Sequence, residues 1–152
     1  MSDKPARVLV VDDDADIRTI VGINLDLAGL EIGEASNGQE ALDMLSGGDW
    51  DACVLDLAMP QTDGLTALKT LRDQKMLDDL VVVILSATSS PKRAIEGMEI
   101  GAHAHLTKPF SPAAVAEVVK ELIDLPPAQR NERRKSMLDR AAEMERLGMT
   151  TV

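Results

Sequence analysis

Aromatic side chains are nearly absent from this sequence, which has one Trp, one Phe and no Tyr among 152 residues. Aliphatic residues, methionine and alanine must therefore fill the core, and such a core suits parallel strands covered by helices. Cysteine is as scarce, since Cys53 is the only one. A lone cysteine excludes a disulfide framework and indicates a reducing, cytoplasmic compartment. Because Cys53 lies in an apolar run, we expect it to be a buried packing residue.

Long apolar runs are missing too. None approaches the roughly 18 residues of a membrane span, and the N-terminus lacks the apolar stretch of a secretion signal, so no membrane association is expected. Basic residues are the minority, with 16 Lys and Arg against 26 Asp and Glu and a formal net charge of −10. This balance argues against direct nucleic-acid binding by the chain.

Apolar runs and helical patterns alternate five times before residue 125. The expected strands lie at 7–11, 30–35, 51–55, 80–85 and 103–106. The expected helices lie at 15–28, 38–46, around 65–71, from the Ser90 cap to about 99, and from the Ser111 cap to about 123. This alternation predicts right-handed crossovers and an α/β fold with a doubly wound parallel sheet.

Polar residues stand at the carboxyl ends of four expected strands. Asp12 and Asp13 follow the first strand, Asp56 the third, Ser86 the fourth and Lys108 the fifth. Each alone has an ordinary explanation as a helix cap, a turn residue or a solvated side chain. In open parallel sheets, however, ligands bind at the carboxyl ends of the strands near the switch in strand order. Their conjunction there favours a chemical site.

The chemistry of these groups points to a metal and a phosphoryl group. Neighbouring carboxylates repel one another, and a divalent cation removes the conflict. Mg²⁺ prefers oxygen ligands, which Asp12, Asp13 and Asp56 could supply. Lys108 could pair with Asp56, and Ser86 could donate a hydrogen bond to a phosphoryl oxygen. A nucleophile, a metal and donors are the parts required for phosphoryl transfer to a carboxylate.

These residues and their surroundings resemble the receiver domain of two-component response regulators, the CheY-like family. The matching segments are Val8–Asp14, Leu55–Pro60, Asp63–Gly64, Ile84–Ala87 and Leu106–Phe110. The resemblance implies a flavodoxin-like, five-stranded sheet of order 2-1-3-4-5 with five flanking helices. It divides the chain into a receiver domain at 1–125 and a helical C-terminal tail at 126–152.

The resemblance also implies a role for each site residue. Asp56 would accept a phosphoryl group from a phosphohistidine on a sensor histidine kinase or a histidine phosphotransfer protein. Asp12, Asp13 and Asp56 would hold Mg²⁺, with the backbone carbonyl of Ala58 as a further ligand. Lys108 would contact the phosphoryl group.

The output is implied as well. Ser86 would move toward the phosphoryl oxygens and change a protein–protein surface on the fourth helix, fifth strand and fifth helix. That surface would bind a downstream protein target, and it or the tail could form a dimer. Such a chain gains and loses its own phosphoryl group and is not a turnover enzyme.

The sequence departs from the family pattern at His105, at Ala58 and in its C-terminal tail. His105 stands three residues before Lys108, where the family usually has Tyr or Phe, and it titrates near neutral pH. We expect it to be partly packed, and we expect His103 at the surface. Ala58 is small and should let water reach the phosphoryl group, which favours a moderate or fast loss.

The C-terminal tail is short and polar. Residues 127–147 predict a helix too poor in apolar residues for an output domain. A single-domain regulator is favoured over the receiver portion of a longer multidomain regulator or hybrid kinase.

A phosphoesterase with an aspartyl-phosphate intermediate would need a second Asp at Ala58. A flavin-binding module would need a phosphate loop where Asp12 and Asp13 stand.

Overall fold

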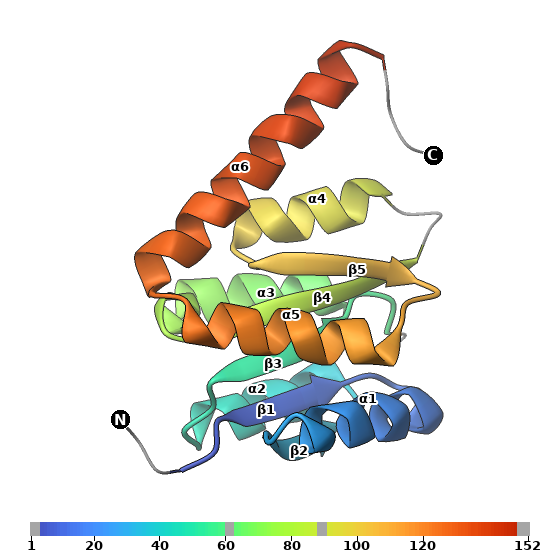
Figure 1. Ribbon diagram of the computed structural model, residues 1–152, viewed down its shortest axis with the longest axis vertical. Coiled ribbons are helices and arrows are strands. Elements are labelled where there is room, and N and C mark those ends of the chain that lie inside the picture. Colours follow the sequence, from blue (N-terminus) through green and yellow to red (C-terminus); the bar gives the residue numbers. More distant parts are fainter. Residues whose placement is uncertain (1–3, 60–62, 88–90, 149–152) are drawn as a thin grey trace.

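The computed structural model describes residues 4–59, 63–87 and 91–148 (Figure 1). Its strands are β1 (Arg7–Val11), β2 (Glu31–Ala35), β3 (Ala52–Asp56), β4 (Val81–Ala87) and β5 (Ala104–Lys108). All neighbouring strands pair in parallel, in the order β2-β1-β3-β4-β5. The predicted fold class and strand order are therefore confirmed.

Six α-helices lie in the described part of the chain. They are α1 (Ala15–Leu27), α2 (Gly38–Ser46), α3 (Gly64–Asp73), α4 (Pro91–Ile100), α5 (Pro112–Asp124) and α6 (Pro127–Arg146), with a short 3-10 turn, η1, at Met76–Asp78. In Figure 1, α1 and α5 lie in front of the sheet, and α2 and α3 lie behind it. The sheet is thus covered on both faces, as the apolar strands require.

Alternate residues of the strands build two separate cores. Cys53 and Leu55 face a core that α2, α3 and α4 complete, while Ala52 and Val54 face one that α1 and α5 complete. Every residue of β3 is buried, so its side chains are apolar or small until the last one. That last residue, Asp56, is only 1% exposed.

Short polar side chains start the helices. The Asp14 carboxylate accepts from the Asp16 N–H before α1, and the Asn37 side chain accepts from the Glu40 N–H before α2. These bonds satisfy backbone donors that a helix leaves free at its start. The cap expected at Ser90 lies outside the described residues. Gly29 follows α1 with φ of 87°, a conformation that glycine adopts without steric cost.

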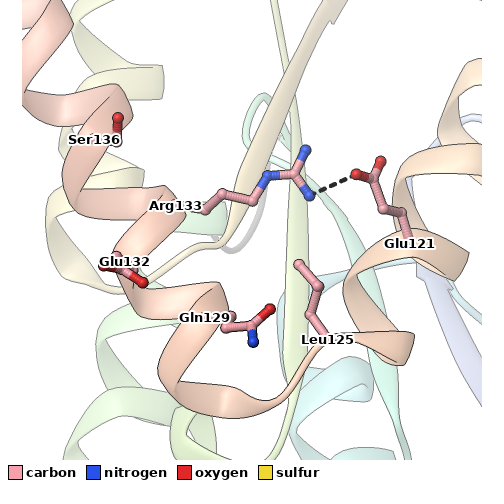
Figure 2. A pocket seen from close by; sticks show the side chains of 6 residues that line it. All are labelled: Glu121, Leu125, Gln129, Glu132, Arg133 and Ser136. Carbon is pink, nitrogen blue, oxygen red and sulfur yellow. Dashed lines mark ion pairs between the residues drawn. The ribbon is translucent and has the colours of Figure 1, made fainter.

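The tail helix α6 is anchored to the domain by arginine side chains at its base. Arg130 donates to the carbonyl oxygens of Leu122 and Ile123, at 2.8 and 3.2 Å, at the end of α5. Arg133 pairs with Glu121 at 2.9 Å across the groove between α5 and α6 (Figure 2). These contacts hold the base of α6 against α5.

The middle of α6 reaches α4. Arg134 donates to the carbonyl oxygen of Met98 at 3.2 Å, and Met137 and Leu138 pack against the core beneath α4. Beyond them α6 runs past α4 and away from the sheet (Figure 1), and Leu147 is 58% exposed. No helix of the described residues is both long and apolar enough to cross a membrane.

The structure corrects several sequence predictions. β3, β4 and β5 each run one or two residues further than expected, because pairing continues through Asp56↔Leu85 and Ala87↔Lys108. Ile20 belongs to the apolar positions that predict one packing face for the helix at 15–28, yet it is 46% exposed. His103, expected at the surface, is only 4% exposed, because its Nδ1 accepts a hydrogen bond from the buried Val82 N–H.

Candidate functional site

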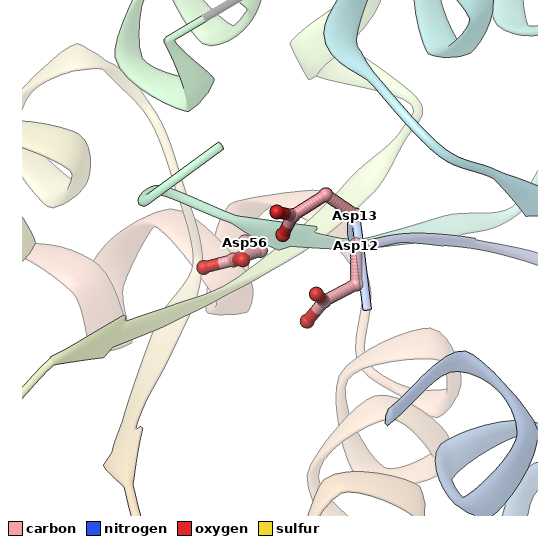
Figure 3. A group of neighbouring side chains, drawn as sticks. All are labelled: Asp12, Asp13 and Asp56. Atoms are coloured by element: carbon pink, nitrogen blue, oxygen red, sulfur yellow. The ribbon is translucent and has the colours of Figure 1, made fainter. Parts of the chain in front are cut away.

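The carboxylates of Asp12, Asp13 and Asp56 meet at the carboxyl edge of the sheet (Figure 3). Val11 pairs with Leu55 in neighbouring parallel strands, so the next residues, Asp12 and Asp56, lie side by side. One oxygen from each carboxylate lies within 4.8 Å of the other two. Parallel pairing of β1 with β3 therefore brings together acids that are 44 positions apart.

Asp12 is the acid most affected by this environment, being 1% exposed. Its Oδ1 accepts a hydrogen bond from the Asp14 N–H at 3.0 Å, and its Oδ2 is buried without a hydrogen-bond partner among the described residues. Burial raises the pKa of Asp12 to about 6, and the nearby charge of Asp56 adds to the rise. The hydrogen bond from Asp14 opposes it.

Lys108 brings positive charge to the two buried acids. Its Nζ lies 3.3 Å from Asp56 Oδ1 and 3.8 Å from Asp12 Oδ2. Lys108 is the last residue of β5, and its stem reaches back over the sheet edge to β3. Its side chain is 32% exposed, so the ammonium sits where the crevice opens to solvent.

Asp56 is oriented by the backbone that follows it. Its Oδ1 accepts a hydrogen bond from the Ala58 N–H at 3.1 Å. Ala58 itself is exposed, and its side chain is only a methyl group. The carboxylate is thus held in place by the backbone of the residue two positions beyond it.

Ser86 lies on β4, the strand next to β3, and His105 lies on β5, one strand further along the sheet. Leu85 pairs with Asp56, so Ser86 stands one position beyond it on β4, and it is 2% exposed. His105 pairs with Ile84 and is half-buried. Its Nδ1 is buried without a hydrogen-bond partner among the described residues, and burial lowers the pKa of the ring. Burial therefore disfavours the charged form of His105.

The donor set fits a magnesium ion. Three carboxylates converge, and one of their oxygens, Asp12 Oδ2, is buried and lacks a hydrogen bond. Mg²⁺ takes oxygen ligands and retains waters, which suits a cluster with Asp13 on its exposed side. The sequence prediction of a metal site at this edge is thus compatible with the geometry.

Two arginines near the site were missed by the sequence reasoning. Arg18 Nη1 donates to the Asp12 backbone carbonyl oxygen at 2.6 Å. Arg93 Nη2 donates to the Leu57 carbonyl oxygen at 3.0 Å. Charged residues on helices read as solvated positions, so only the packing of α1 and α4 on the sheet shows these contacts.

Comparison with known proteins covers most of this chain. Residues 8–120 match the family model described as the response regulator receiver domain. The alkaline phosphatase synthesis transcriptional regulatory protein PhoP of Bacillus subtilis is 37% identical over 117 residues, 77% of this chain and 48% of that protein. The response regulator MprA of Mycolicibacterium vanbaalenii is 39% identical over 107 residues, 70% of this chain and 46% of that protein. The chain thus spans about half the length of these relatives.

Solved structures resemble the fold over most of their own length. The receiver domain of the Francisella response regulator 1452 has a TM-score of 0.72 and 36% identity, over 78% of this chain and 96% of that one. The response regulator TrrA of Thermotoga maritima, in complex with Mg²⁺ and BeF, has a TM-score of 0.67 and 30% identity, over 76% and 97%.

Proposed function

Because this chain belongs to the response regulator receiver family of two-component systems, we propose that it is a switch that accepts a phosphoryl group on Asp56. The observation that carries the proposal is the crevice itself, where a buried carboxylate lies 3.3 Å from an ammonium and beside two further acids. A nucleophile, a counter-charge and a cation site at one place are what phosphoryl transfer needs.

The transfer step uses Asp56 as the nucleophile. One of its carboxylate oxygens forms the new P–O bond while the P–N bond of a phosphohistidine breaks, and the imidazole leaves with the bonding electrons. Lys108 balances the charge on the phosphoryl oxygens, since its Nζ already lies beside Asp56 Oδ1. Asp12, Asp13, Asp56 and the Ala58 carbonyl would hold Mg²⁺, which would supply further positive charge when bound.

The donor is a protein, either a sensor histidine kinase or a histidine phosphotransfer protein. The helix that begins beside the acids carries three exposed aliphatic side chains, Ile20, Ile23 and Leu27. They follow one another by three and four positions and so share one stripe of α1. An exposed apolar stripe on the helix that starts beside the crevice suits contact with another protein.

Phosphorylation then changes a surface that a downstream protein recognises. The new group adds about −1.5 to −2 charges at the strand ends. Ser86 can donate its hydroxyl to that group from the neighbouring strand, and β4 leads directly toward α4. We place the altered surface on α4, β5 and α5, with His105 beneath it, and α6 borders that surface where Arg134 meets Met98.

The chain loses its own phosphoryl group but does not turn over a substrate. Ala58 stands where a phosphoesterase of this chemistry would carry a second acid, so the site lacks that acid–base group. The small, exposed side chain of Ala58 offers little obstruction to an attacking water. We therefore expect a phosphoryl lifetime well short of many hours. The buried, unpaired Cys53 suits a cytoplasmic setting.

Phosphotransfer from a small phosphodonor tests the proposal. Wild type, Asp56→Asn and the control Asp26→Asn, an exposed acid on α1, are incubated with acetyl phosphate and Mg²⁺ and weighed by intact mass spectrometry. Wild type and Asp26→Asn should each gain one phosphoryl group, and Asp56→Asn should gain none. Equal labelling of all three proteins, or no labelling of wild type, would contradict the proposal.

A further inference from the structure

Arg93 joins the start of α4 to the loop that follows the phosphoacceptor strand. Its Nη2 donates to the carbonyl oxygen of Leu57 at 3.0 Å and also to Asp63 Oδ1. Arg93 is the third residue of α4, and Leu57 directly follows Asp56. One guanidinium therefore connects a helix packed beside β4 with the residue next to the proposed nucleophile.

The bond to Leu57 acts on Asp56 through a single peptide group. The carbonyl oxygen of Leu57 and the N–H of Ala58 belong to the same peptide group, which is planar. Arg93 donates to the carbonyl oxygen of this peptide group, and the N–H of the same group donates to Asp56 Oδ1 at 3.1 Å. Holding the carbonyl in one direction therefore holds the N–H on the carboxylate. The same plane leads into Ala58, whose own carbonyl is the ligand expected for Mg²⁺.

The second contact ties this arrangement to α3. Asp63 Oδ1 accepts from the Leu65 N–H at 3.0 Å and so caps the first turn of α3 while it pairs with Arg93. Gly64 lies tightly against the same backbone, since an added Cβ would stand 2.6 Å from the Asp56 carbonyl oxygen. Arg93 thus bridges α4, the cap of α3 and the peptide group beside Asp56.

We propose that Arg93 is a positioning residue that orients the Leu57–Ala58 peptide group, and thereby sets Mg²⁺ affinity and phosphoryl turnover at Asp56. This inference rests on the proposed function. The side chains of Arg93 and Asp63 are 39% and 42% exposed, so their ion pair adds little to folding stability. The contact to Leu57 matters for the geometry of the site, and it makes the first turn of α4 part of that site.

The test compares Arg93→Gln and Asp63→Asn with the control Arg72→Gln. Arg72 is an arginine on α3 whose exposed pair with Asp73 is of the same kind. Asn at position 63 can still cap α3, so that variant weakens the arginine contact alone. Each protein is measured for hydrogen–deuterium exchange of the Ala58 amide, for Mg²⁺ affinity by calorimetry, for phosphoryl loss after labelling with acetyl phosphate, and for melting temperature.

In Arg93→Gln, the Ala58 amide should exchange faster, and Mg²⁺ should bind about three- to tenfold more weakly, the range expected for one lost hydrogen bond. Asp63→Asn should change the Ala58 exchange rate and the Mg²⁺ affinity in the same directions, by smaller amounts than Arg93→Gln. Phosphoryl loss should change from the wild-type rate in both variants, while Arg72→Gln and all melting temperatures stay close to wild type. Losing a positive charge would by itself tighten Mg²⁺ binding, so weaker binding reports lost position.

Unchanged Ala58 exchange with unchanged or tighter Mg²⁺ binding in Arg93→Gln would overturn the inference. A lower melting temperature with wild-type exchange and affinity would also overturn it, by giving Arg93 a structural role only. Amide exchange and metal binding need no phosphoryl transfer. Failure of Asp56 labelling in the wild type would thus count against the proposed function. The role of the Arg93 contact to Leu57 would still be tested by Ala58 amide exchange and Mg²⁺ affinity.

Discussion

The buried His103 should make folding stability depend on pH in a window set by its own pKa. Burial, together with the charges of Arg130 and Arg134, lowers the pKa of His103 from 6.5 to about 4. The neutral ring accepts a hydrogen bond from the Val82 N–H at 3.0 Å, and protonation of Nδ1 would replace that acceptor with a second donor. The folded state therefore disfavours the charged ring.

The sign and size of the effect follow from linkage. Between pH 6.5 and pH 4 the unfolded chain binds a proton at His103 that the folded chain refuses, so stability falls as the pH falls through this window. Each pKa unit corresponds to about 1.4 kcal/mol, so the full shift corresponds to about 3 kcal/mol. Above pH 6.5 the contribution is complete.

The perturbation is His103→Asn, because an Asn oxygen can accept from Val82 but does not titrate. Urea unfolding of wild type and variant is followed by the fluorescence of Trp50, the only Trp, at about pH 7.5 and about pH 4.5. Between about pH 7.5 and about pH 4.5, the free energy of unfolding of wild type should fall by about 2 to 3 kcal/mol more than that of the variant. Asp12 and the other acids titrate in both proteins, so their effects cancel in this difference.

A constant stability difference between wild type and His103→Asn at both pH values would refute the reasoning. It would mean that the ring is accessible to protons in the folded state, or that Nδ1 is not the acceptor for Val82. His105→Asn is the matched control, because burial also lowers the pKa of that ring but its Nδ1 accepts no hydrogen bond from the described residues.

Two further perturbations examine the acidic crevice. Lys108→Met leaves two buried carboxylates without their nearest counter-charge. The free energy of unfolding at neutral pH should therefore fall by about 1 to 3 kcal/mol and recover when Mg²⁺ is added. Urea titrations with and without Mg²⁺ measure this, and a loss of stability that Mg²⁺ leaves unchanged would contradict it. Gly64→Ala places a Cβ 2.6 Å from the Asp56 carbonyl oxygen and should lower the free energy of unfolding by about 1 to 3 kcal/mol. In the control Gly47→Ala the new Cβ meets nothing nearer than 3.6 Å, so its stability in thermal unfolding should be close to that of wild type. Equal stability of the two variants would count against tight packing beside Asp56.

The arrangement of helices around α4 gives the proposed switch its setting. Arginines contact backbone carbonyls near both ends of this helix, Arg93 from α4 itself to Leu57 and Arg134 from α6 to Met98. The first contact lies beside Asp56, and the second lies where the tail helix crosses the domain. A shift of α4 would therefore change the contacts both at the site and in the middle of α6.

The sequence alone determined the sheet and the identity of the residues at its carboxyl edge. Strand and helix periods alternate clearly, and parallel strands joined by right-handed crossovers place all their carboxyl ends at one edge. Asp12, Asp56 and Lys108 had to meet there once the strand order was right. Local patterns were sufficient because Asp12 and Asp56 each end an apolar run and Lys108 ends the weaker fifth strand.

The tertiary structure alone decided the contacts made by long or ambivalent side chains. Nothing near His103 in the chain predicts its burial, which depends on Val82 in the neighbouring strand and on the approach of α6. Arg93 and Arg134 read as solvated helix positions, yet their guanidinium groups end on carbonyl oxygens 36 residues away. Periodicity reports which face of an element is buried, but where a flexible charged side chain ends depends on which backbone groups its neighbours leave within reach.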